Sequence, residues 1–190
     1  MISLVYVVNI LMKIKITFIW LVTFILIITG CNDNDEKIRF EGIILTDDTG
    51  ASLGTKGSTD LNDWQQDDKL PDEVLAMMDV QHGEDLSDTD YALLEIVGFP
   101  NPCNETARVN FVITGGPCLL KIVVVNEQLQ MLYRSVKLVT GDNHVFDFSD
   151  QGKFPDQSIV RVYYSFSTEE DPDFYVGHGD FWICRSGNCN

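Results

Sequence analysis

Residues 108–125 read RVNFVITGGPCLLKIVVV, and this stretch decides the class of fold. Val109 and Phe111 alternate with polar neighbours, which is the period-two pattern of a β-strand with one buried face. The sequence GGP at 115–117 then turns the chain, and a second apolar run covers Leu119–Val125. The stretch therefore predicts two consecutive strands joined by a turn.

The same pattern continues towards the C-terminus. Turn residues separate further short β segments at 130–139, 145–148, 159–166 and 174–184. Because no helical period of useful length appears among them, we expect a mostly β protein with an antiparallel β-sandwich over 97–184 and a short tail over 185–190. The inward phases of these segments carry most of the aromatic side chains: Phe111, Phe146, Phe148, Tyr164 and Phe166.

Residues 31–95 have a different composition, rich in Asp, Gly, Ser and Thr, which predicts a flexible acidic segment with a short strand at 40–45. Proline and acidic residues precede apolar ones at 71–78, so one short helix is expected there. Trp64 stands alone among polar residues and either docks this segment on the sandwich or contacts a partner. Off-phase aromatic residues of the sandwich are further candidates for partner contact: Tyr133, Tyr163, Tyr175 and Trp182.

The sequence GFPNPCNETARVNFVI at 98–113 resembles the opening of C-terminal sandwich domains in Bacteroidota. These are the type IX secretion sorting domains and the related immunoglobulin-like modules of flagellar hook-capping type. The runs VTGDNHVFDFSD, VRVYYSF and FYVGHGDFWIC are similar to their later strands. The resemblance covers roughly half of the chain and implies an immunoglobulin-like sandwich.

This chain departs from that family at three places. It has Gln128 or Leu129 and then Gln157-Ser158 where the family's turns carry glycine, and its end lacks the basic closing segment of a sorting domain. A structural or binding module is therefore expected. Cargo or an accessory component of type IX secretion is the alternative.

The N-terminus contains an apolar run at 16–28 that ends shortly before Gly30 and Cys31. The run is shorter than the about 20 residues of a membrane span and has the length of a signal-peptide core. Small residues leading into a cysteine resemble the signal of bacterial lipoproteins. That resemblance implies removal of residues 1–30 and acylation of Cys31, which anchors the chain to the membrane. A plain signal peptide or an N-terminal membrane anchor is the alternative.

The acidic run at 32–36 follows Cys31 directly and resembles the tethers of lipoproteins exported to the outer face of the outer membrane. The periplasmic face is the alternative location, and translation starts at Met1 or Met12. The whole chain has a net charge of −16, which repels nucleic acid and anionic lipid. We therefore expect an outer-membrane lipoprotein that contacts a protein or a glycan and binds no nucleic acid.

Four cysteines besides Cys31 leave an even number to pair in a compartment that permits disulfides. Cys184 and Cys189 would close a small loop at the C-terminus. Cys103 and Cys118 would form the second bridge. Four cysteines allow three pairings, and the sequence leaves these alternatives open.

His178 and Asp180 are the sharpest polar cluster, because alternate residues of a strand share one face. Such a pair would ligate a metal or act as acid and base, and the alternative is a solvent-facing strand with glycines at a bulge. Carboxylate-rich loops at 85–90 and 169–173 offer oxygen ligands to calcium without the EF-hand spacing. With no Gly-x-Ser-x-Gly elbow, we expect a non-catalytic protein. A calcium-dependent binding or hydrolytic protein is the remaining alternative.

Overall fold

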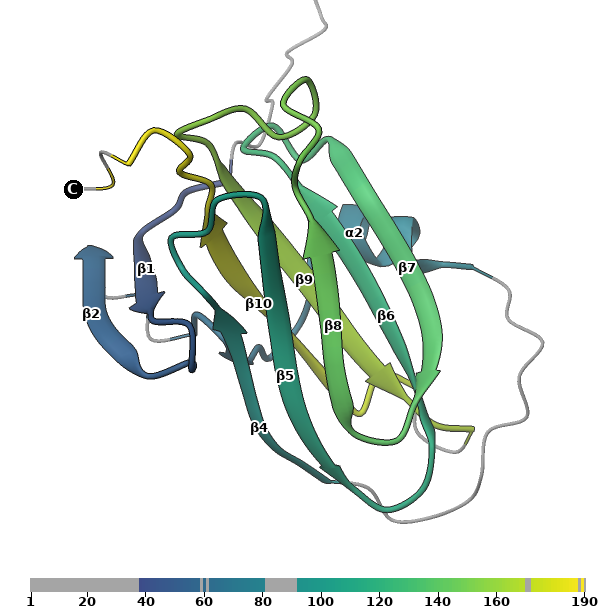
Figure 1. Cartoon of the computed structure of the whole chain (residues 1–190). Coiled ribbons are helices and arrows are strands. Elements are labelled where there is room, and N and C mark those ends of the chain that lie inside the picture. Colours follow the sequence, from purple (N-terminus) through teal and green to yellow (C-terminus); the bar gives the residue numbers. More distant parts are fainter. Residues whose placement is uncertain are drawn as a thin grey trace, which may run out of the picture. The chain divides into compact units, whose positions relative to one another are not determined.

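Two antiparallel β-sheets packed together make up most of the computed structural model (Figure 1). The structure describes residues 38–58, 60, 62–80, 92–169, 172–187 and 189. The larger sheet has the strand order β10-β9-β6-β7, and the smaller has β4-β5-β8. In chain order the strands are β4 (Ala92–Phe99), β5 (Thr106–Thr114), β6 (Cys118–Val125), β7 (Met131–Val139), β8 (Asp142–Asp147), β9 (Ile159–Ser167) and β10 (Tyr175–Trp182). A mostly β, antiparallel fold is therefore confirmed.

Shorter elements precede the sandwich. They are the antiparallel pair β1 (Gly42–Thr46) and β2 (Ser52–Gly57), the two-residue β3 (Gln65–Gln66), and the helix α2 (Asp72–Met78). The strand expected at 40–45 and the helix expected at 71–78 coincide with β1 and α2 to within two residues. Pro71 precedes the helix and acidic residues occupy its first turn, which suits the positive end of the helix dipole.

The main core lies between the two sheets. β5 alternates strictly between exposed and buried residues from Thr106 to Phe111, as the sequence pattern predicts. The aromatic side chains that were assigned to inward phases are all buried, and several pack edge-to-face. They are Phe111, Phe146, Phe148, Tyr164 and Phe166.

The outer face of the larger sheet is also covered where β9 lies. Every residue of β9 after Ile159 is buried, so this strand has no solvent-facing side. Leu70, Val74 and Met78 pack in one cluster with Tyr163 of β9 and with two valines of β6. A strand that is buried on both faces has no period-two polarity, because neither face needs polar side chains.

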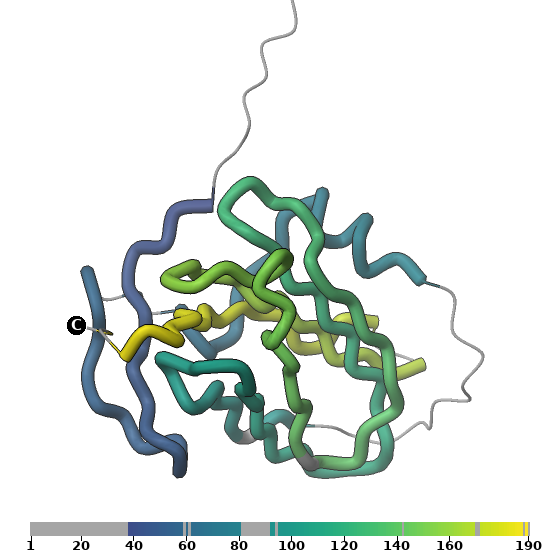
Figure 2. Tube along the Cα trace, turned by 45° about the horizontal axis from the view of Figure 1, so that its top comes forward, coloured from purple at the N-terminus to yellow at the C-terminus, as the bar shows by residue number. Residues whose placement is uncertain are grey.

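The segment at 38–80 differs from the flexible segment expected over 31–95. It forms β1, β2, β3 and α2, and it belongs to the same compact unit, Glu36–Asn190, as the sandwich. Figure 2 shows the first hairpin running along the side of the body where the C-terminal residues lie. The smaller sheet also begins at Ala92, ahead of the expected boundary at 97. The acidic segment at 38–80 is therefore a folded layer that packs against the sandwich.

The cysteine prediction is half right. Cys184 and Cys189 form a disulfide, whereas Cys103 and Cys118 are buried free thiols. Strand register gives the reason. Cys118 begins β6 beside the end of β9, whereas Cys103 pairs with Ile183, beyond the end of β10 and beside the start of β9. The two thiols therefore lie at opposite ends of the larger sheet, too far apart for a disulfide.

Several expectations concern residues outside the described part of the chain. These are the signal peptide at 1–30, the lipidation site Cys31, the acidic run at 32–36 and the acidic loop at 85–90. Within the described ranges, no helix has the length and apolar character to cross a membrane.

Candidate functional site

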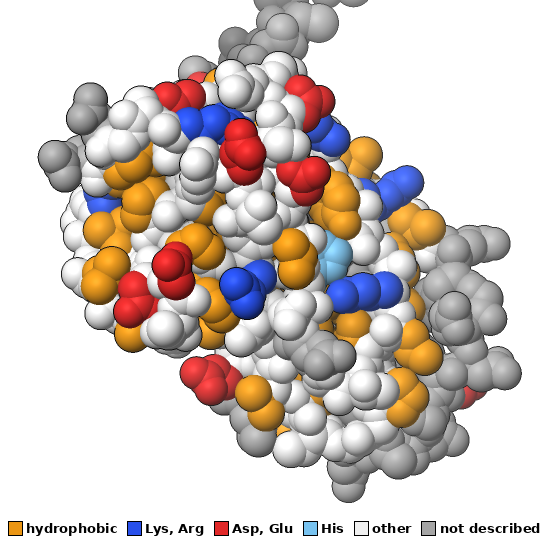
Figure 3. Space-filling view, in the orientation of Figure 1, with side chains coloured by type: hydrophobic (Ala, Val, Ile, Leu, Met, Phe, Trp, Pro, Cys, Tyr) orange, Lys and Arg blue, Asp and Glu red, His pale blue; other side chains and the backbone are white. Residues whose placement is uncertain are grey.

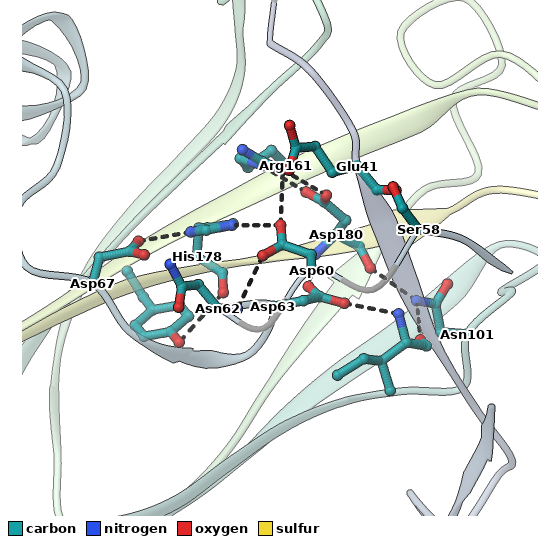
Figure 4. A network of polar contacts seen from close by, with 12 residues as sticks. Glu41, Ser58, Asp60, Asn62, Asp63, Asp67, Asn101, Arg161, His178 and Asp180 are labelled. Atoms are coloured by element: carbon teal, nitrogen blue, oxygen red, sulfur yellow. Dashed lines mark hydrogen bonds and ion pairs between the residues drawn. The ribbon is translucent and has the colours of Figure 1, made fainter. Parts of the chain in front are cut away.

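A buried polar network joins β10 to the segment at 60–67 (Figure 4). His178 and Asp180 do share one face of β10, but they are only 8% and 0% exposed. The alternative of a solvent-facing strand is therefore wrong. The segment at 60–67 pairs with the free edge of β10, because Trp64 N–H donates to the carbonyl of His178 and Asp67 N–H donates to that of Val176. The acidic segment thus lies along the edge strand of the larger sheet.

Arg161 of β9 holds the first part of the network. Its Nε and one terminal nitrogen donate to the two carboxylate oxygens of Asp180 at 2.8 and 2.7 Å. The same terminal nitrogen lies 3.9 Å from Asp60. The guanidinium also lies over the ring of Phe40, 5.4 Å from its centroid. Two acidic side chains and one aromatic ring therefore enclose a single cation.

His178 holds the second part. Its Nδ1 lies 2.7 Å from Asp67 Oδ2, and its Nε2 lies 3.5 Å from Asp60 Oδ2. Burial favours the neutral imidazole, but the hydrogen bond and the charge of Asp67 outweigh it and raise the pKa of His178 above its ordinary value. The histidine therefore links two carboxylates of the 60–67 segment to β10.

Asp63 connects three elements. Its two oxygens accept hydrogen bonds from the backbone N–H groups of Ile44 in β1 and Asp180 in β10, both at 2.8 Å. Burial favours the protonated acid and raises the pKa of Asp63 to about 7, with a further contribution from the negative charge of Asp180. The two N–H donors favour the ionised carboxylate and so lower the pKa, but the effect of burial is larger.

Asn101 completes the connection to β1. Its side-chain nitrogen donates to the carbonyls of Ile44 and Asp180, each at 2.8 Å, and its side-chain oxygen accepts from Trp182 N–H at 2.9 Å. Its backbone exchanges two hydrogen bonds with Thr46. All the hydrogen-bonding capacity of this buried amide joins β1 to β10, which is the role of a structural residue.

The charged side chains of the network bond to one another and to the backbone. Both oxygens of Asp180 are taken by Arg161, and both oxygens of Asp63 by backbone amides. Within the described ranges, no group of three His, Cys, Asp or Glu residues is arranged to hold a metal ion. His178 and Asp180 therefore each bond to other partners and not to one another.

In the loop at 169–173, the described carboxylates are Glu169 and Asp173, and Asp173 has fixed partners. Asp173 accepts hydrogen bonds from Ser165 and from Ser167, the latter at 3.0 Å, and forms an ion pair with Lys121 at 3.3 Å. Glu170 and Asp171 lie outside the described residues.

The aromatic residues predicted as contact candidates are mostly internal. Trp64, Tyr163 and Trp182 are 5%, 5% and 4% exposed, which excludes them from a surface platform, and Tyr175 is half-buried. Trp64 docks its segment: its ring lies between Gly98 and Gly179, where a Cβ atom would approach it to 2.2 Å. Of the two roles expected for Trp64, docking is the one that its burial supports. Off-phase position failed as a sign of exposure because both faces of β9 and of most of β10 are covered.

A groove of about 570 Å³ opens at one end of the sandwich. Its walls are the turn at 126–130 between β6 and β7, the connection at 152–160 that leads into β9, and Phe40. Charged side chains of both signs gather at the upper end of the face in Figure 3, where these loops lie in Figure 1. A volume of 300–1,000 Å³ is typical of small-molecule sites.

Sequence patterns did not reveal this groove, because turn composition predicts only a change of chain direction. The one sequence feature that distinguished these two loops was the absence of glycine at 128–129 and 157–158. Leu129 and Gln157 have φ angles of 57° and 62°, which non-glycine residues seldom adopt. The Gln157 side chain accounts for its own conformation, since its amide nitrogen donates to Ser186 Oγ at 2.9 Å and contacts Cys184 Sγ.

Comparison with known proteins gives no relative: no family model, no curated protein and no solved structure matches this chain.

Proposed function

We propose that this protein is a non-catalytic, lipid-anchored protein of the bacterial cell envelope that contacts a protein or glycan through the groove at the end of its sandwich. The groove carries the proposal, because it is a sizeable concave surface built from loops on a rigid scaffold. The network around His178 and Asp180 supports the non-catalytic part, since its charged groups are committed to holding the 60–67 segment in place.

The lipoprotein signal at Cys31 supports the membrane anchor. Ile38 lies only seven positions after Cys31, and an extended chain of that length spans at most about 25 Å. Ile38 donates its backbone N–H to the carbonyl of Glu127, a residue of the groove wall, and Phe40 follows in the same wall. An acylated Cys31 would therefore keep the groove within reach of the membrane surface.

We further propose that the sandwich is immunoglobulin-like. Its first, second and fifth strands, β4, β5 and β8, form one sheet, and β6, β7, β9 and β10 form the other. This division between two antiparallel sheets is typical of immunoglobulin-like and related sandwiches, in which consecutive strands cross from one sheet to the other. The resemblance of residues 98–113 to such modules supports the same proposal.

Mass spectrometry of the mature N-terminus tests the anchor. We expect cleavage before Cys31 and acyl groups on that residue. We also expect Cys31→Ala to release the protein from the membrane fraction. An unmodified Cys31, or a Cys31 still inside the mature chain, would refute the lipid anchor.

Proteinase treatment of intact cells tests the location. Digestion is expected if the domain is displayed on the outer face, whereas full protection in intact cells and digestion after lysis would place it on the periplasmic face. For contact through the groove, the matched pair of variants is Gln130→Ala in the wall and Asn110→Ala, an exposed amide on β5. Crosslinking on cells should lose the partner only with the first variant.

A further inference from the structure

We propose that the groove binds an uncharged, polyhydroxylated ligand, a segment of a neutral saccharide chain. This inference rests on the proposed function, because it names the ligand class of the same groove. The wall is rich in amide side chains, which supply both donors and acceptors in a planar arrangement. The amides of the wall are Asn126, Gln128, Gln130 and Gln157, with the hydroxyl of Ser158 beside them.

Sugar hydroxyls need partners of this kind, because each hydroxyl both donates and accepts hydrogen bonds. Gln130 accepts a hydrogen bond from Asn126 at 2.9 Å, which fixes the amide plane. In the described part of the chain, no partner occupies the amide nitrogen of Gln130 or the side-chain oxygen of Gln157. The groove thus offers one donor group and one acceptor that a ligand hydroxyl can satisfy.

The groove also has an apolar side, formed by Phe40, Leu132, Pro155 and Ile159. A sugar ring presents hydroxyls at its edge and C–H groups on its faces, so it matches a wall that is part amide and part apolar. Phe40 is held in place because Arg161 lies over its ring, and Arg161 is fixed by its two bonds to Asp180. The buried network therefore gives this wall a fixed position before any ligand arrives.

Charge argues against an anionic ligand. The wall contains two acidic residues, Glu127 and Asp156, and one basic residue, Lys153. The whole chain carries a net charge of −16. An anionic saccharide or a phosphate would approach a surface of its own sign. The affinity of a neutral ligand is not reduced by this negative potential.

The backbone of the two loops in the wall offers little to an extended peptide. A bound peptide strand needs a free sheet edge with unpaired N–H and C=O groups. Here the turn at 126–130 uses its own backbone groups, since Asn126 and Gln130 bond to one another and Leu129 N–H donates to Asn126. The other wall is closed in the same way, with Phe154 N–H donating to Asp150 and Ser158 N–H to Pro155. Recognition by these two loops therefore comes mainly from side chains.

The test uses the full-length protein in detergent on an array of defined probes. The array carries neutral gluco-, manno- and N-acetylated oligosaccharides, sulfated and uronic-acid oligosaccharides, and unstructured peptides. The strongest probe is then titrated by calorimetry. We expect binding to a neutral oligosaccharide, weakened about tenfold by Gln130→Ala, because one hydrogen bond contributes about 1–1.5 kcal/mol. Asn110→Ala, which changes an exposed amide outside the groove, should leave the affinity unchanged.

Other outcomes overturn the inference and separate it from the proposed function. Binding of peptides alone, weakened by Gln130→Ala, would refute the saccharide class while the groove remained a contact site. Binding of anionic saccharides alone would refute the charge argument. Absence of binding, or binding that Gln130→Ala does not weaken, would refute the groove as a saccharide site. The anchor is judged separately, by the chemistry found at Cys31.

Discussion

Asp63 should make the stability of this protein depend on pH in an unusual direction. In the folded state its pKa is raised to about 7 from an ordinary 3.8, chiefly by burial. Each pKa unit corresponds to about 1.4 kcal/mol, so the shift corresponds to about 4 kcal/mol as an upper bound. Because the folded-state pKa is the higher one, this stabilisation is present below pH 4 and is lost as the pH rises towards 7.

The perturbation is Asp63→Asn, which keeps the shape and one acceptor oxygen but removes the titration. The measurement is urea unfolding between pH 4 and pH 8.5, followed by the fluorescence of Trp64 and Trp182, both of which are buried. We expect the unfolding free energy of the wild type to fall relative to that of the variant as the pH rises. The change in the difference should approach about 4 kcal/mol.

Subtracting the variant from the wild type removes the contributions of other groups. His178 has a raised pKa and also stabilises the fold at low pH, whereas burial lowers the pKa of His144 to about 4 and makes that residue destabilising in acid. Both contributions are present in wild type and variant. A difference that stays constant with pH would contradict a raised pKa of Asp63, because it would show that the two N–H donors keep Asp63 ionised throughout.

Three further predictions concern the docked segment and the thiols. Asp180→Asn removes a charged partner of buried Arg161 and should lower the unfolding free energy by about 3 kcal/mol, measured by urea unfolding. Gly179→Ala places a Cβ atom 2.2 Å from the ring of Trp64 and should cost about 1–3 kcal/mol, with a red-shifted tryptophan emission as the segment loosens. Maleimide labelling followed by mass spectrometry should find no accessible thiol in the folded domain and two after denaturation without reductant, namely Cys103 and Cys118.

Each of these has a control or a contrary outcome. Gly152→Ala meets only the side chain of Asp150 at 3.3 Å, so it should change stability little and serves as the control for Gly179→Ala. An Asp180→Asn variant as stable as the wild type would show that the ion pair contributes nothing beyond its shape. A mass matching a second disulfide would contradict the free thiols, whose pKa values burial raises to about 12 for Cys103 and about 11 for Cys118.

The alternation in β5 could be read from the sequence because one face of that strand meets the core and the other meets water. β9 shows the opposite case. Its residues from Val160 to Ser167 are all buried, since α2 and the 60–67 segment cover the face that alternation would assign to solvent. Tyr163 was therefore predicted as a contact residue for a partner, and its contact is with the protein's own helix.

The acidic segment shows the same limit in its charges. Asp60 and Asp67 have the composition of a solvated loop, yet they are half-buried against Arg161 and His178, about a hundred positions further along the chain. Sequence reasoning placed His178 and Asp180 on one face correctly. The partners of these two residues could not be predicted, because no local pattern indicates a contact between residues so far apart in the sequence.

The pattern of residues is enough to predict a mostly β, acidic chain folded as an antiparallel sandwich, because burial of one strand face leaves a period of two in the residues themselves. The packing of distant segments is needed to see that the acidic segment at 38–80 lies against the sandwich, that Cys103 and Cys118 cannot pair, and that a groove opens beside Gln130. The reason is physical. Local patterns record what each strand faces on average, whereas a buried ion pair, a thiol separation and a concave wall depend on which distant segments the fold brings together.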